Sequence, residues 1–144
     1  MSERSLVATI AAILLATGTS ASHAQDSSAA AASVSTLSGV YSKDQASRGE
    51  KTYEAKCTAC HAPSVHTGEA FTRAWETRTA YDLFELIRTT MPNDDPGSLS
   101  REQYGEIVAY LFKLNDFPAG RRPLPTENEG LKQVKIESRT GPSC

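Results

Sequence analysis

Apolar residues recur with the 3.6-residue period of an α-helix in several segments of the chain, most regularly over residues 101–114. Ser100 and Gln103 stand at the spacing of a capping box, and Leu99 can pack against Tyr104 as a hydrophobic staple. We therefore predict a helix that begins at Arg101 and ends near residue 114. Its expected buried face consists of Tyr104, Ile107, Val108, Leu111 and Leu114.

The segment 40–56 predicts another long helix. Ser42 is a suitable N-cap, and Gln45 stands at the capping-box position. Ala46, Gly49, Tyr53 and Cys57 fall on one face. A glycine in the middle of a helix costs about 1 kcal/mol relative to alanine, and a close contact with another backbone would explain Gly49.

Two shorter helices are expected between these segments, at residues 67–76 with Thr67 as N-cap and at 80–89 with Thr79 as N-cap. Residues 91–97 read as a loop, since Pro92 disfavours helix at Met91. The polar segment 119–144 carries a few apolar positions and reads as a partly mobile arm that lies on the domain. We find no βαβ rhythm and no repeats, and we expect an all-α fold.

The N-terminus has the pattern of an export signal. A short polar start precedes an apolar run over residues 6–17, which is too short to span a bilayer. Small residues at 22 and 24 then predict cleavage before Gln25, although an uncleaved anchoring helix is the alternative. We assign residues 1–24 to a signal peptide, 25–38 to a flexible Ser/Ala-rich lead, 39–118 to one domain and 119–144 to the arm. Export would place the mature chain in the periplasm, without a transmembrane span.

The net charge of −2 gives no basic patch that would favour a nucleic-acid partner. The chain contains three cysteines, and two of them belong to Cys57-Thr58-Ala59-Cys60-His61. This Cys-x-x-Cys-His pattern is typical of covalent haem c attachment. Each thiol can form a thioether with one haem vinyl group, and the imidazole of His61 can bind the iron. Cys144 is left over, and we expect it to be a free, exposed thiol.

Two simpler interpretations of the motif remain open. Cys-x-x-Cys alone can be a redox-active disulfide or half of a zinc site. A zinc site needs further ligands, for which the chain offers His66, Cys144 and carboxylates. A thioredoxin-like motif needs a βαβ setting, which the pattern does not predict.

A haem iron has a second axial position. After removal of residues 1–24, Met91 is the only methionine, and it lies on the loop stiffened by Pro92. Methionine paired with histidine raises the reduction potential of a haem. We therefore predict His61 and Met91 as iron ligands, although a lone methionine can also be a core residue. His66 is the competitor, and its place shortly after His61 favours a loop role.

Three side chains are candidates for contacts with haem propionates. The indole N–H of Trp75 can donate a hydrogen bond to a propionate, although a packed core role is equally compatible with the sequence. The guanidinium groups of Arg78 and Arg73 can pair with a propionate, but solvated arginines are common.

The chain resembles small single-haem c-type cytochromes. The resemblance covers about residues 40–117 and rests on Gly49-x-x-x-Tyr53-x-x-x-Cys57-x-x-Cys60-His61, on Met91-Pro92 and on Val108-Ala109-Tyr110-Leu111. It implies a cytochrome c-like fold with three main helices plus a short one around one covalent haem. It also implies that the first and last helices cross near Gly49 and that Tyr53 meets the Tyr110 region.

A narrower resemblance concerns residues 71–92, which are similar to cytochromes that accompany periplasmic quinoprotein dehydrogenases. It implies a dehydrogenase as electron donor and an oxidase or another cytochrome as acceptor. Such cytochromes usually have a longer loop after the motif, with a proline that braces the proximal histidine. Here only residues 62–66 precede the Thr67 cap, and Pro63 is the available proline.

These patterns predict an exported electron carrier and not an enzyme. Catalysis such as peroxide reduction would require an open or labile sixth position. A haem-based sensing or docking module is a further alternative.

Overall fold

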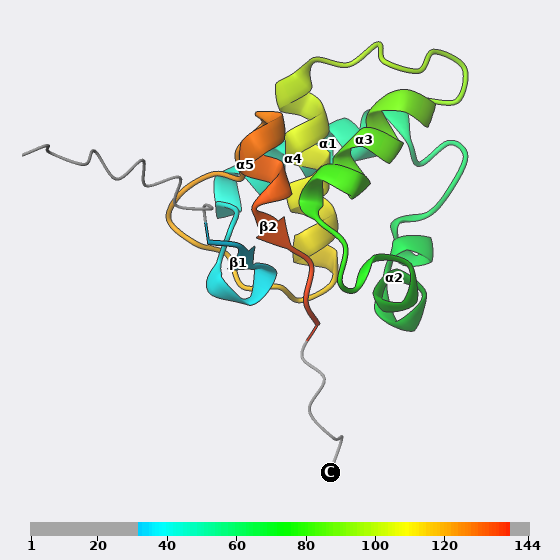
Figure 1. Cartoon of the computed structure of the whole chain (residues 1–144). Helices are drawn as coiled ribbons and strands as arrows, with labels where there is room; N and C mark the ends of the chain where they lie inside the picture. Colours follow the sequence, from blue (N-terminus) through cyan, green and yellow to red (C-terminus); the bar gives the residue numbers. More distant parts are fainter. Residues whose placement is uncertain (1–31, 139–144) are drawn as a thin grey trace, which may run out of the picture.

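The computed structural model describes residues 32–138 (Figure 1). Its helices are α1 (Lys43–Lys56), α2 (Gly68–Trp75), α3 (Ala80–Thr90), α4 (Arg101–Leu114) and α5 (Asn128–Lys132). Two 3₁₀ turns, η1 (Thr36–Ser38) and η2 (Pro63–His66), and the parallel strand pair β1 (Val34–Ser35) and β2 (Val134–Lys135) complete the described part. The prediction of an all-α fold with three main helices plus a short one is confirmed, and α5 and the strand pair are additions to it.

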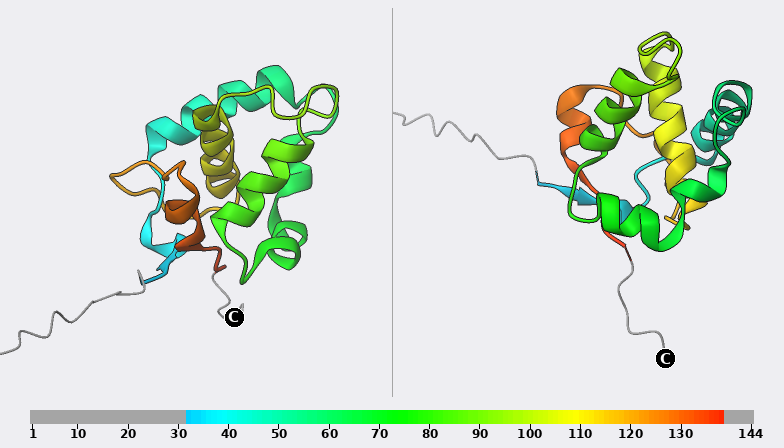
Figure 2. Two further views of the ribbon diagram at one scale, coloured as in Figure 1. Left: turned by 45° about the horizontal axis from the view of Figure 1, so that its top comes forward. Right: turned by 90° about the vertical axis from the view of Figure 1, so that its right-hand side faces the viewer.

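Helices α1 and α4 cross one another at the centre of the molecule (Figure 2). The crossing depends on Gly49, because a Cβ atom there would lie 1.9 Å from the carbonyl oxygen of Glu106. One turn later, the rings of Tyr53 and Tyr110 pack with centroids 5.4 Å apart. The close backbone contact expected for Gly49 and the contact between Tyr53 and the Tyr110 region are both confirmed.

Three of the four predicted N-caps are confirmed. Ser100 and Thr79 accept hydrogen bonds from backbone N–H groups of their first turns, and each completes a capping box. Ser42 caps α1, but the side chain of Gln45 does not return to it. Thr67 makes no cap hydrogen bond, since its hydroxyl donates to the carbonyl of Ser64 instead.

Helix α4 is buried on more than the face that the periodicity marked. Gly105, Ala109, Tyr110 and Phe112 are buried as well as four of the five predicted apolar positions, whereas Leu114 is only partly buried. Part of this burial comes from α1, since Tyr110 packs against Tyr53. Residues 117–138 cover another part of α4, with Phe117 against Phe112 and Thr126 beside Gly105. The segment contributes Phe117, Leu124, Leu131, Val134 and Ile136 to the core.

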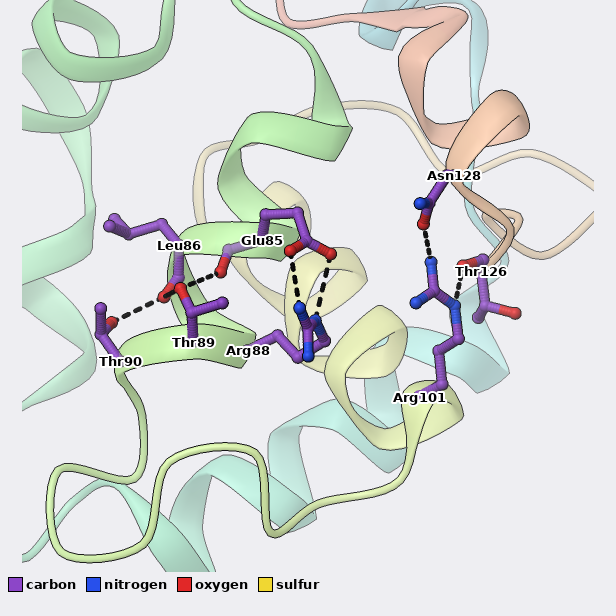
Figure 3. Close-up of polar contacts among 8 residues, drawn as sticks. All are labelled: Glu85, Leu86, Arg88, Thr89, Thr90, Arg101, Thr126 and Asn128. Carbon is purple, nitrogen blue, oxygen red and sulfur yellow. Dashed lines mark hydrogen bonds and ion pairs between the residues drawn. The ribbon is translucent and has the colours of Figure 1, made fainter.

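Polar contacts fasten this segment to the helices. The buried amide of Gln45 donates to the carbonyl of Leu124 at 3.0 Å and accepts from its N–H at 2.7 Å. This use of the amide explains why Gln45 does not complete the predicted capping box. At the start of α4, Arg101 donates to the carbonyl of Thr126 at 2.6 Å and also to the side chain of Asn128 (Figure 3).

The end of the predicted flexible lead is ordered. Residues 34 and 35 pair with 134 and 135 in the sheet. The fully buried Thr36 donates to the carbonyl of Glu137 at 3.1 Å and accepts from its N–H at 3.0 Å. This corrects the expectation of flexibility for residues 34–38, because these groups find partners about 100 positions away in the chain. The remaining lead at 25–31, the predicted signal peptide at 1–24 and Cys144 lie outside the described residues.

Candidate functional site

An apolar cavity lies between the end of α1 and helices α2, α3 and α4. Three of the residues predicted to bind haem, Cys57, His61 and Met91, line it. The other lining residues are Tyr53, His66, Phe71, Trp75, Leu83, Leu86, Ile87, Thr90, Ile107 and Leu111.

The cysteine motif continues the backbone of α1 for about one turn. The N–H of Cys57 donates to Tyr53 O at 2.8 Å, and the N–H groups of Cys60 and His61 donate to Cys57 O at 3.1 and 3.2 Å. Cys57 is half-buried against the cavity, whereas Cys60 is exposed and faces a neighbouring depression that also includes Met91 and Pro92. The turn therefore presents both thiols and the imidazole within one short segment.

The arrangement of Cys57, Cys60 and His61 fits covalent haem better than a redox-active disulfide or a zinc site. Both thiols are free and not joined in a disulfide. Burial, with a smaller contribution from Cys60, raises the pKa of the Cys57 thiol. Between residues 32 and 138, no group of three or more His, Cys, Asp or Glu side chains is arranged to hold a metal ion, so this part of the chain contains no preformed zinc site. The apolar cavity beside the thiols suits a porphyrin.

The imidazole of His61 is held from its Nδ1 side. The hydroxyl oxygen of Tyr53 lies 2.7 Å from Nδ1, and Nε2 of His66 lies 3.2 Å from it. Burial raises the pKa of Tyr53 to about 12. Burial and then the neighbouring His61 lower the pKa of His66. Because His66 lies behind His61 on the Nδ1 side, its position agrees with the loop role that the sequence favoured.

A side chain from α4 braces the short loop after the motif. The amide nitrogen of Asn115 donates to His66 O at 2.9 Å and to Leu111 O at 2.8 Å, and its Oδ1 accepts from the N–H of Gly68 at 3.1 Å. The sequence offered Pro63 as the available proline for bracing, and Asn115 was not among the candidate site residues. An amide side chain just after a helix that packs on the motif was the signal that could have indicated this role.

Met91 is placed by two backbone hydrogen bonds at the end of α3. Its N–H donates to Ile87 O, and its carbonyl accepts from the hydroxyl of Tyr104, both at 2.8 Å. The last turn of α3 is further tied by Thr89 and Thr90, whose hydroxyls each donate to a carbonyl of their own helix at 2.6 Å (Figure 3). The sequence marked Tyr104 as a staple residue and missed its bond to the Met91 backbone.

Of the three propionate candidates, only Trp75 lines the cavity. Trp75 is half-buried. Arg78 is exposed and is not among the lining residues, and its guanidinium carbon lies 5.3 Å from the centroid of the Trp75 ring. Arg73 is exposed and pairs with Glu69 at 3.7 Å. A propionate contact by Trp75 or Arg78 stays a prediction.

Comparison with protein families supplies an independent observation. Residues 44–111 match the family model described as cytochrome c oxidase, cbb3-type, subunit III. Residues 44–111 are a c-type cytochrome domain. The match runs from the first turn of α1 into the last turn of α4 and includes the cysteine motif and Met91. Neither a curated protein nor a solved structure matched the chain.

The cytochrome domain accounts for the predicted fold, which is cytochrome c-like. Cytochrome c domains hold haem c covalently and act as electron carriers, and proteins of this family are usually exported. None of the helices between residues 32 and 138 is both long enough and apolar enough to cross a membrane.

Proposed function

We propose that this cytochrome is exported to the periplasm, holds a single haem c and passes single electrons between periplasmic redox proteins. The observation that supports this most directly is the gathering of Cys57, His61 and Met91 around one apolar cavity. The expected donor is a dehydrogenase, and the expected acceptor is an oxidase or another cytochrome. The similarity of residues 71–92 to dehydrogenase-associated cytochromes supports the donor.

Each residue has a separate task in this proposal. Cys57 and Cys60 supply the two thioether sulfurs, which fix the cofactor covalently. His61, through Nε2, and Met91, through its sulfur, would hold the iron. A haem bound here supplies one-electron chemistry between ferric and ferrous iron. The soft sulfur of Met91 favours the ferrous state and raises the potential, while the apolar lining keeps water away from the site.

The polar groups of the cavity support electron transfer over haem-based catalysis. Besides Cys57, its ionisable lining residues are Tyr53, His61 and His66. Tyr53 and His66 both contact His61 at Nδ1. A peroxidase-like reaction needs an acid–base group on the opposite side of the cofactor. Among the residues that the structure describes, no other ionisable side chain lines this cavity, and the nearest ones on the Met91 side, Lys56 and Asp94, line the neighbouring depression.

Haem attachment is the first test. A pyridine haemochrome assay on the periplasmic fraction should report one haem per chain, and the Cys57→Ser/Cys60→Ser double variant should retain none after denaturation. A wild-type chain without covalent haem would contradict the proposal. Stopped-flow mixing with reduced periplasmic dehydrogenases should then reduce the protein, and failure with every dehydrogenase tested would count against the proposed donor class.

A further inference from the structure

The proximal imidazole is contacted by side chains at the position where a ligand histidine needs a hydrogen-bond partner. A histidine that binds a metal through one ring nitrogen donates from the other, and that partner fixes the orientation and basicity of the ring. Nδ1 of His61 lies 2.7 Å from the hydroxyl oxygen of Tyr53 and 3.2 Å from Nε2 of His66. The inference below rests on the proposed role of His61 as an iron ligand.

Tyr53 is well suited to this task because its own position is fixed. The residue is 1% exposed, belongs to α1 one turn after the Gly49 crossing and packs its ring against Tyr110. Its hydroxyl also lies 3.4 Å from the carbonyl oxygen of His61. The hydroxyl can therefore accept the Nδ1 proton of His61 and direct its own proton toward that carbonyl.

His66 provides a second, longer contact from the loop side. Its ring is nearly perpendicular to that of His61, with an interplanar angle of 89° and centroids 4.9 Å apart. The loop that carries it is held at the carbonyl of His66 by Asn115. The shorter distance and the more buried partner both identify Tyr53 as the principal acceptor.

We propose that Tyr53 is a positioning residue of this cytochrome, whose hydroxyl accepts the Nδ1 proton of His61 and thereby sets the orientation and donor strength of the proximal ligand. A hydrogen-bonded Nδ1–H makes the imidazole a stronger electron donor and favours ferric iron. Loss of the acceptor should therefore shift the redox equilibrium toward ferrous iron. Tyr53 would lower the potential from the His61 side, while the Met91 sulfur raises it.

The test uses the haem-loaded full chain and two matched variants. Tyr53→Phe removes the acceptor and keeps the ring, whereas Tyr110→Phe removes a hydroxyl from the ring that packs against Tyr53 and leaves the bond between Tyr53 and His61 in place. In equilibrium with a redox mediator, Tyr53→Phe should raise the ferrous-to-ferric ratio about three- to tenfold. Tyr110→Phe should change it less than twofold.

A second measurement does not depend on how well the variants fold. In the ¹⁵N-labelled, reduced wild-type protein, the Nδ1 proton of His61 should exchange slowly with water. Fast exchange would overturn the proposal, as would an unchanged ratio in Tyr53→Phe or an equal shift in Tyr110→Phe. A wild-type chain without haem would overturn both this inference and the proposed function, whereas a haem-loaded chain with fast exchange would overturn only the inference.

Discussion

The two sides of helix α4 are built in different ways. On the cavity side, short motifs and local caps position the groups for chemistry: Cys57 and His61 follow directly from α1, and Met91 ends α3. On the opposite side, the segment 117–138 packs against α4 and α1 with contacts to residues far away in the chain, such as the pairing of Leu124 with Gln45 of α1. The chemistry of the protein is thus encoded locally, whereas the packing that holds α1 and α4 in place depends on distant residues.

The largest loss of stability is expected from a substitution at the crossing of α1 and α4, where both sides meet. Gly49→Ala places a methyl group 1.9 Å from the Glu106 carbonyl oxygen, which is backbone and cannot move aside. We expect the free energy of unfolding to fall by at least about 3 kcal/mol, as in strong overpacking, measured by urea denaturation of the haem-loaded protein.

The matched control is another glycine in the same helix pair. Gly105→Ala would meet only the methyl group of the Thr126 side chain, at 2.8 Å, which can turn away. Alanine is also the better helix former by about 1 kcal/mol, so this variant should lose less than about 1 kcal/mol. Equal losses at both positions would contradict the tight crossing.

A smaller loss of stability is expected when the contact between Gln45 and the segment 117–138 is removed. Gln45→Leu leaves the N–H and carbonyl of Leu124 without their partner, and a buried unsatisfied group costs about 1–3 kcal/mol. We expect a loss of about 2–3 kcal/mol and earlier amide exchange of residues 119–138 than of α3. The control Ser42→Ala removes only the cap of α1 and should cost about 1 kcal/mol. Equal losses would mean that Gln45 acts as a cap residue and does not hold the segment.

The smallest effect concerns the local cap that begins α3 on the cavity side. The backbone N–H of Thr79 donates to the carboxylate of Asp82 and holds the pKa of Asp82 below its ordinary value. A lowered folded-state pKa means that the contribution is present above the unfolded pKa of about 3.9 and is lost as the pH falls through the folded value. Asp82→Asn should thus cost less than about 1 kcal/mol at pH 7.

This difference between Asp82→Asn and the wild type should shrink as the pH falls below about 4. Thermal unfolding of both proteins at pH 7 and at lower pH measures it. A difference that stays constant with pH would show that the charge of Asp82 does not matter to the cap.

The sequence predicted most of what depends on local patterns. Ser100 and Thr79 capped the helices as expected, and the mid-helix Gly49 indicated a close crossing that the structure contains. The cavity brings together Cys57, His61 and Met91, which were chosen from motif and composition alone.

What the sequence did not reveal depends on side chains that find distant partners. Gln45 looked like half of a capping box, but a backbone 79 positions away uses its amide. Thr36 lay in a segment that read as flexible, and its hydroxyl bonds to Glu137. The sequence predicted only the packing of the Tyr53 ring and not the contact of its hydroxyl with His61, because spacing along the chain carries no information on where a phenol oxygen points.

The most direct test of the account is the near-infrared optical spectrum of the oxidised, haem-loaded protein at neutral pH. If Met91 is the sixth ligand, the wild type should show the sulfur-to-iron band together with low-spin features, and Met91→Ala should lose the band. A neighbouring control, Leu86→Ala, should keep it, because Leu86 lines the same cavity without a ligand atom. A wild type without the band and with high-spin features would contradict the electron-carrier account and favour catalysis at an open iron.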